Sequence, residues 1–248
     1  MTSSERQPVA AWQAEHLRLT LFHSPTNIGA GVWREFTHED PSEQTTQAKA
    51  AIIREQGPFR GGVLVTEIRP DRVDVVHSAA MDAASSLPII GPCESLFSEF
   101  VQSGCEWLST QKHDVRRVAL GSALLLPGPD RETGYRRLAA YLPFAPDPSA
   151  FDFVYQINRR RDSTSVPQLL LNRLSRWSVV KVQATAISFA PGTSTAYAIG
   201  DPTFACRMEL DVNTAVEGGT PIPPNRMADL LHELATLSHE IIESGDQK

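Results

Sequence analysis

The chain has 248 residues, 41% of them hydrophobic and 21% charged, which is the composition of a globular protein with room for one large domain or two small ones. The sequence contains no run of about 18 apolar residues, so no transmembrane helix is predicted. The first residues lack the basic and apolar blocks of a secretory signal. The three cysteines, Cys93, Cys105 and Cys206, are scattered, so neither a disulfide framework nor a zinc site is predicted. We therefore expect a cytoplasmic protein.

Charge is unevenly distributed along the chain, whose net charge is −6. Residues 1–114 carry 9 Lys and Arg against 15 Asp and Glu, and residues 183–248 carry 3 against 9. Residues 115–182 carry 11 against 5 and are basic. Nucleic-acid-binding domains are usually basic as a whole, so this acidic, basic, acidic order disfavours such a function.

The first half begins with a predicted strand. Residues 16–22 place Leu17, Leu19 and Leu21 on one side, as a half-buried strand does. Residues 24–45 mix Pro, Gly, Thr and acidic residues and are typical of a loop. Residues 44–56 are predicted to form a helix that ends at Gly57-Pro58.

A hairpin and a long helix are expected next. Two runs rich in β-branched residues flank Pro70-Asp71, and this dipeptide favours a turn. Residues 94–108 repeat large apolar side chains at helical spacing, which predicts a helix with one buried face.

The second half is predicted to follow a similar order. Alternating apolar residues favour strands, and the longer apolar periodicity near the end favours a closing helix. The expected elements are a strand at 115–126, a short helix at 132–142, strands at 151–158, 177–189 and 206–213, and a final helix at 225–246.

The predicted fold class is α+β. Clean alternation is typical of antiparallel sheets with one face buried and one in water, and the order of elements is not that of a doubly wound fold. We expect two loosely repeated halves, each a curved antiparallel sheet packed by a long helix. The N-terminal half would span residues 1–112 and the C-terminal half 113–248, packed as one unit.

The final helix contains two His-Glu pairs, which raise the question of a metal site. His232 and His239 are two turns apart, about 10.5 Å of helix rise, whereas two histidines on one zinc are usually one turn apart. Both fall opposite the apolar face centred on Leu234. We expect a solvated helix face with a weak pair between His239 and Glu243, and we predict no metal site.

An arginine group is the candidate binding site. Five guanidiniums would lie near one sheet edge if the strands at 151–158 and 177–189 are neighbours, and they could bind an anion or an acidic partner. The alternative is a solvated edge that resists aggregation. The candidates are Arg159, Arg160, Arg161, Arg173 and Arg176.

Residues 166–174, beside this group, contain three consecutive leucines. They are interpreted as a mobile flap, a docking surface or a simply buried segment. Tyr155 and Trp177 are the candidate lining of a ligand pocket between sheet and helix.

Several segments resemble a sporadically distributed family of uncharacterised bacterial proteins of comparable length. The similar segments are GVLVTEIRPDRVDVV (62–76), SLFSEFVQSGCEWL (95–108), VRRVALGSALLL (115–126), MELDVN (208–213) and LLHEL (230–234). The resemblance implies no known reaction or active site. The family's sporadic occurrence is similar to that of accessory genes, such as those of phage-defence operons.

The function expected from these features is a non-enzymatic subunit or regulator that binds another protein, or its own copy, in a bacterial multi-protein assembly. No catalytic residue, cofactor or membrane contact is predicted. The alternative is a domain that binds a small ligand or nucleotide. A third hypothesis is an enzyme whose site is assembled from distant residues, including His77, His113 or Asp114.

Overall fold

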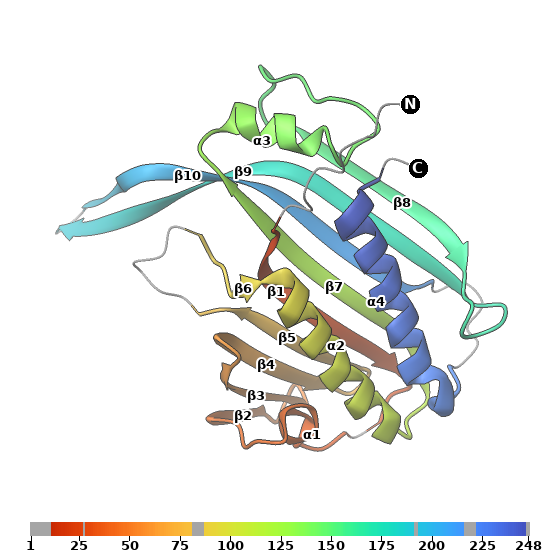
Figure 1. Ribbon diagram of the computed structural model, residues 1–248. Coiled ribbons are helices and arrows are strands. Elements are labelled where there is room, and N and C mark those ends of the chain that lie inside the picture. Colours follow the sequence, from red (N-terminus) through yellow and green to blue (C-terminus); the bar gives the residue numbers. More distant parts are fainter. Residues whose placement is uncertain (1–10, 27, 81–86, 191–192, 216–221, 247–248) are drawn as a thin grey trace, which may run out of the picture.

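The computed structural model describes residues 11–26, 28–80, 87–190, 193–215 and 222–246. A single antiparallel sheet of ten strands forms its body, in the order β2-β3-β4-β5-β1-β7-β10-β9-β8, with β6 paired to the start of β1 (Figure 1). The strands are β1 (Gln13–His23), β2 (Glu43–Gln47), β3 (Ile52–Phe59), β4 (Gly62–Arg69), β5 (Arg72–Ala79), β6 (Gly91–Pro92), β7 (Val115–Gly128), β8 (Val154–Asp162), β9 (Leu170–Ala190) and β10 (Thr193–Thr214).

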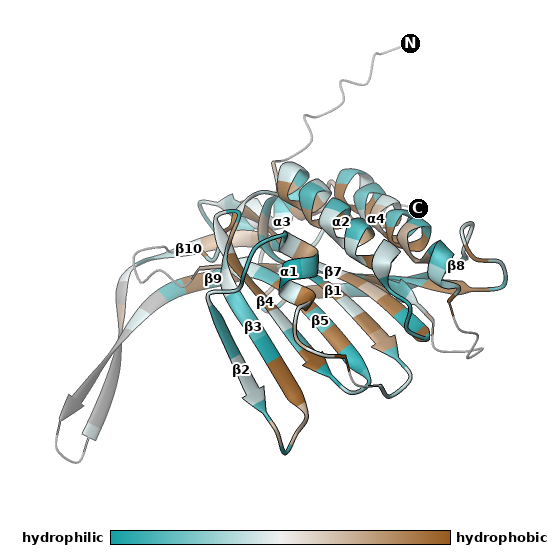
Figure 2. Cartoon of the chain, turned by 90° about the horizontal axis from the view of Figure 1, so that it is seen from below, coloured by the Kyte–Doolittle hydropathy of each residue, from teal (hydrophilic) through white to brown (hydrophobic). Residues whose placement is uncertain are grey.

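The helices all lie on one face of this sheet (Figure 2). They are α1 (Val32–Thr37), α2 (Cys93–Thr110), α3 (Arg131–Leu138), the short 3-10 helix η1 (Pro224–Arg226) and α4 (Met227–Ser244). Alternate residues of the strands face the helices and form the main hydrophobic core with them, among them Leu17, Leu19, Met208 and Leu210. We call the opposite side of the sheet the open face, because none of the described helices covers it.

The α+β class is confirmed, but the expected pair of separate sheets is wrong. β1 and β7 are hydrogen-bonded neighbours at the centre of one continuous sheet, with Leu19 opposite Leu120. The apolar sides of β1 and β7 face the same layer of helices. When the two strands pair, both apolar sides are therefore buried in one core. The expected boundary at residues 112 and 113 lies between α2 and β7 and does not divide the sheet.

The helix expected at 44–56 is wrong, because this region forms β2 and β3. Glu55 and Gly57 of β3 face α1, and a Cβ on Gly57 would lie 3.2 Å from the Trp33 ring. Gly57-Pro58 therefore lies within a strand and ends no helix. The loop expected at 24–45 also contains α1 and the start of β2.

The other expected elements are confirmed with adjusted bounds. The hairpin is β4 and β5, and the two long helices are α2 and α4. The short helix is α3, which ends earlier than expected, and β9 begins earlier than expected.

Candidate partner-binding surfaces

The five candidate arginines lie at the β8 edge of the sheet, but on both of its faces. β8 pairs with β9 so that Arg159 lies opposite Arg173. Because side chains alternate along a strand, these two and Arg161 face α4. Arg160 and Arg176 lie on the open face.

The three arginines that face α4 are paired with its acidic residues. Arg159 Nε lies 2.7 Å from the Asp246 carboxylate. Arg173 and Arg161 both approach Glu240, at 3.1 and 3.5 Å. Burial, together with the neighbouring Arg161, lowers the pKa of Arg173. These contacts join the end of α4 to the sheet edge, which gives the three side chains a structural role.

The two arginines on the open face have polar neighbours of their own. Arg160 Nε donates to the Asn172 side chain at 3.1 Å, and Arg176 Nη1 lies 3.2 Å from Glu209. A partner that binds here would meet charges that are already in contact with neighbouring strands. Binding of an anion or acidic partner by the arginines remains a prediction.

Trp177, one of the two candidate pocket residues, is packed among aromatic rings. The Trp177 ring is 0% exposed and stacks on Tyr141 at 5.6 Å, with Trp12 edge-on at 6.2 Å. The space between sheet and helices at this position is therefore filled by aromatic rings. The Tyr155 hydroxyl donates to Asp246 at 2.7 Å and belongs to the contact between β8 and the chain's C-terminal end.

The leucine-rich segment at 166–174 follows the burial alternative. Val166, Leu169 and Leu171 are buried, and β9 begins at Leu170. The loop before it is held by Glu233 of α4, which accepts hydrogen bonds from residues 163–165. A mobile flap is not supported, because both the apolar side chains and the loop backbone have partners.

The histidines of α4 lie on its exposed face, as expected. His232 and His239 are both exposed, and His239 Nε2 lies 3.1 Å from Glu243. Within the described residues, no group of three or more His, Cys, Asp or Glu side chains could hold a metal ion.

The residues of the enzyme hypothesis lie at two places. His77 bonds to the Phe59 carbonyl at 2.9 Å. The His113 ring lies beside His23, and Asp114 accepts from the Ser24 hydroxyl, so these two residues meet the end of β1 together. Among the described residues, none of these contacts joins His77 to this group.

The cysteines are poor nucleophiles, because burial raises the pKa of Cys93 to about 12 and those of Cys105 and Cys206 to about 11. A thiolate is the reactive form of cysteine, and at neutral pH these thiols are protonated.

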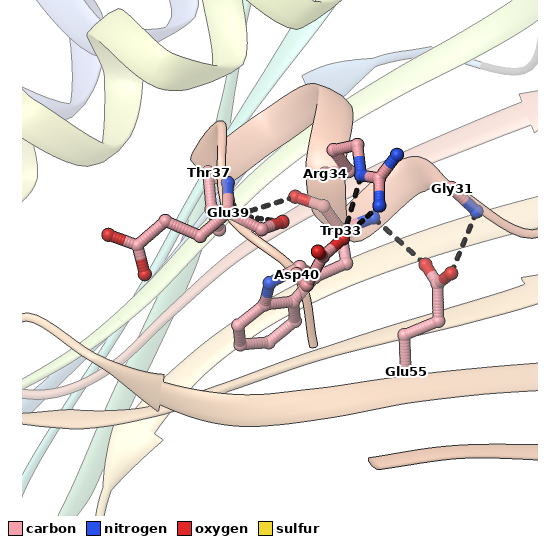
Figure 3. A network of polar contacts seen from close by, with 7 residues as sticks. All are labelled: Gly31, Trp33, Arg34, Thr37, Glu39, Asp40 and Glu55. Carbon is pink, nitrogen blue, oxygen red and sulfur yellow. Dashed lines mark hydrogen bonds and ion pairs between the residues drawn. The ribbon is translucent and has the colours of Figure 1, made fainter. Parts of the chain in front are cut away.

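Glu55 is a buried carboxylate with a structural role (Figure 3). It accepts hydrogen bonds from the backbone of Gly31 at 2.7 Å and Trp33 at 2.9 Å, and from the Thr66 hydroxyl at 3.0 Å. All of these donors belong to the protein, and together they attach the start of α1 to the sheet. The pattern of apolar residues in β3 did not indicate that Glu55 is buried or has this role.

The hairpin of β9 and β10 extends beyond the sheet (Figure 1). β9 leaves β8 after the pair of Ser178 and Val154, and β10 joins β7 only from Phe204 onward. The intervening residues of the two strands pair with each other, from Thr203 opposite Val182 to Thr193 opposite Ala190. We call residues 183–202 the arm. Residues 182–200 contain no Lys, Arg, Asp or Glu.

Exposed aromatic residues gather at the start of β8. Phe151 is 76% exposed and Phe144 is 44% exposed. The Arg131 guanidinium lies over the Phe151 ring at 3.7 Å. The sequence analysis did not identify these exposed aromatic residues.

No family model and no curated protein matches the chain. Within the described residues, none of the helices is both long enough and apolar enough to cross a bilayer.

Proposed function

We propose that the protein is a non-enzymatic, cytoplasmic, protein-binding component of a bacterial multi-protein assembly. The observation that carries this proposal is the arm. Among its described residues the two strands pair only with each other, so their outer edges present unpaired backbone N–H and C=O groups. Soluble proteins usually protect such edges with Lys, Pro or bulges, since they pair readily with other chains. Near its base the arm has a register shift between Ile199 and Thr203, where Asp201 and Pro202 also lie. Beyond the base, residues 182–200 contain no charged residue.

A partner strand that pairs with the arm would satisfy these backbone groups. Such strand addition gains affinity from main-chain hydrogen bonds and specificity from alternate side chains. The position of His77 away from His113 and Asp114, together with the raised thiol pKa values, favours binding over catalysis. The small-ligand alternative is weaker, because Trp177 is packed among aromatic rings.

Shortening the arm tests the proposal. Val182 and Thr203 are directly paired, so Asn-Gly in place of residues 183–202 would close the hairpin with a two-residue turn. We expect this variant to keep the melting temperature of the full chain, because the sheet body is unchanged. We also expect it to lose proteins that co-purify with the tagged full chain from its native host.

A second variant separates edge pairing from arm length. Thr185 is exposed on the arm, and Thr185→Lys places a charge on its edge. The matched control is Gln156→Lys, which adds the same charge to the exposed edge strand β8. Loss of the partner with Thr185→Lys alone would support the proposal. Retention of the same partner by the shortened variant would contradict it.

We also propose that the two halves are an internal repeat. In each half, one strand precedes a three-stranded meander whose last strand pairs with it, and a long helix follows: β1, β3–β5 and α2, then β7, β8–β10 and α4. Alignment of residues 13–110 with 115–244 across homologous chains would test this proposal.

A further inference from the structure

The outer surface of α2 and α4 is acidic along its whole length. α2 contains Glu94, Glu99 and Glu106, α4 contains four acidic residues, and neither helix contains a Lys or Arg. Surface helices commonly mix both signs. Most of these carboxylates have partners. The ion-paired ones are Glu99 with Arg60, Glu106 with His38, Asp229 with Arg226, Glu240 with Arg161 and Arg173, and Glu243 with His239. Glu94 has no ion pair among the described residues.

The two helices enclose a groove on this surface. They approach most closely at Gly104, where a Cβ would lie 2.8 Å from the Leu231 side chain. They spread apart towards the start of α2 and the end of α4 (Figure 1). The hollow between them has a volume of about 830 Å³, with Phe97, Val101 and Ala235 among its apolar lining.

A deeper pocket adjoins the groove at its wide end. It has a volume of about 410 Å³ and is lined by Trp12, Cys93, Phe97 and Ile242, with Glu94 and Glu243 at its border. Its volume lies within the range of pockets that enclose small ligands, so one large apolar side chain would fit.

We propose that this groove binds a basic amphipathic helix of a partner protein. A helix laid in a groove places apolar residues at positions i, i+3, i+4 and i+7 against the floor. One of these would enter the pocket beside Trp12, and Lys or Arg residues on either side would face Glu94 and Glu243. The complementary charge selects a basic helix, because neither hollow is lined by a Lys or Arg.

This inference rests on the proposed protein-binding function but uses a different surface from the arm. The arm variants and the groove variants can therefore fail separately. A partner that is lost on shortening the arm, but is retained by the groove variants, would leave the arm proposal intact and overturn the groove proposal.

The test uses a labelled synthetic peptide of about 18 residues with Leu and Lys at amphipathic helical spacing, and fluorescence anisotropy on the full chain. The matching Leu and Glu peptide is the ligand control. We expect saturable binding of the Lys peptide only. Glu94→Gln with Glu243→Gln should weaken it by about fivefold or more, since rim charges steer and select a charged partner. Ala235→Arg, which fills the groove, should also weaken it.

The matched protein control removes the same charge elsewhere. Glu39→Gln with Glu43→Gln changes two exposed acidic residues away from the groove. We expect less than about a twofold effect from this pair. Equal weakening by both double variants would show non-specific attraction and overturn the proposal, as would absence of binding to the unaltered chain. Self-association that Ala235→Arg abolishes would assign the groove to a second copy and would also overturn it.

Discussion

Glu233 is a partly exposed side chain of α4, yet four hydrogen bonds converge on its carboxylate. The donors are the Ser163 hydroxyl at 2.7 Å, the Thr164 backbone and hydroxyl at 2.7 and 2.9 Å, and the Ser165 backbone at 3.0 Å. Burial acts to raise its pKa, but these bonds outweigh burial and lower the pKa of Glu233 to about 2. The ionised carboxylate therefore fixes the loop between β8 and β9.

We predict that Glu233→Gln lowers the free energy of unfolding by about 1–2 kcal/mol at pH 7, after allowance for solvent screening. The folded-state pKa lies below the ordinary value near 4.5. The stabilisation is therefore present above that value and is lost as the pH falls towards 2. Chemical denaturation at pH 7 and pH 3 measures this, and the gap between the two proteins should narrow at pH 3.

The control for Glu233 is Glu243→Gln on the same helix, where the carboxylate is exposed and contacts only His239 among the described residues. We expect a change within about 0.5 kcal/mol for it. A gap between Glu233→Gln and the unaltered chain that stayed constant with pH would contradict the assigned role of the charge.

At the level of elements, α2 and α4 were predictable because their apolar residues recur at helical spacing over five turns. β2 and β3 were not predictable in this way. The buried positions of β3 hold Glu55 and Gly57, whereas apolar residues at these positions would have indicated a strand. The buried carboxylate is stabilised by backbone donors of α1, which are 22 and 24 residues away along the chain. Local periodicity carries no information about such donors.

The arginine group shows which part of a site the sequence can predict. The sequence analysis assumed that β8 and β9 are neighbours, and alternation along β8 separates Arg160 from Arg159 and Arg161. The face of each arginine was therefore predictable. Their partners Glu240 and Asp246 lie 67 to 87 residues away, and only the packing of α4 on the sheet brings them together. The arm was likewise hidden, because a strand that leaves a sheet has the same sequence pattern as one that stays in it.

The contact between α2 and α4 depends on a glycine. A Cβ at Gly104 would lie 2.8 Å from Leu231 Cδ2 and 3.1 Å from Leu19 Cδ2. We predict that Gly104→Ala lowers the free energy of unfolding by about 1–3 kcal/mol through overpacking, although alanine is the better helix former by about 1 kcal/mol. Thermal and chemical unfolding measure the change.

Ser98→Ala is the matched control, since Ser98 is exposed on the same helix. Its substitution should be neutral or slightly stabilising, because alanine favours helix and no packed neighbour is displaced. A stabilising effect of Gly104→Ala would show that the two helices do not approach as closely as the structure indicates.

For the whole molecule, the end of the chain closes the edge of the sheet. Asp246 accepts a hydrogen bond from the Tyr155 hydroxyl at 2.7 Å and pairs with Arg159 at 2.7 Å. Its backbone N–H donates to the Tyr141 carbonyl at 2.7 Å. One residue after α4 therefore connects β8, the segment after α3 and the last helix, which holds the helical layer against the terminal strand of the sheet.

We predict that Asp246→Ala lowers the free energy of unfolding by about 1–3 kcal/mol, because it leaves the Arg159 guanidinium and the Tyr155 hydroxyl without their shared acceptor. Amide hydrogen exchange should quicken in the last turns of α4 and in β8 before it does so in β1 and β7, because the contact holds the edge and not the centre of the sheet. Asp229→Asn, whose exposed carboxylate pairs with Arg226, should change neither measurement. If Asp246→Ala left exchange in α4 and β8 unaltered, packing alone would hold the helix end to the sheet, which would contradict the role assigned to Asp246.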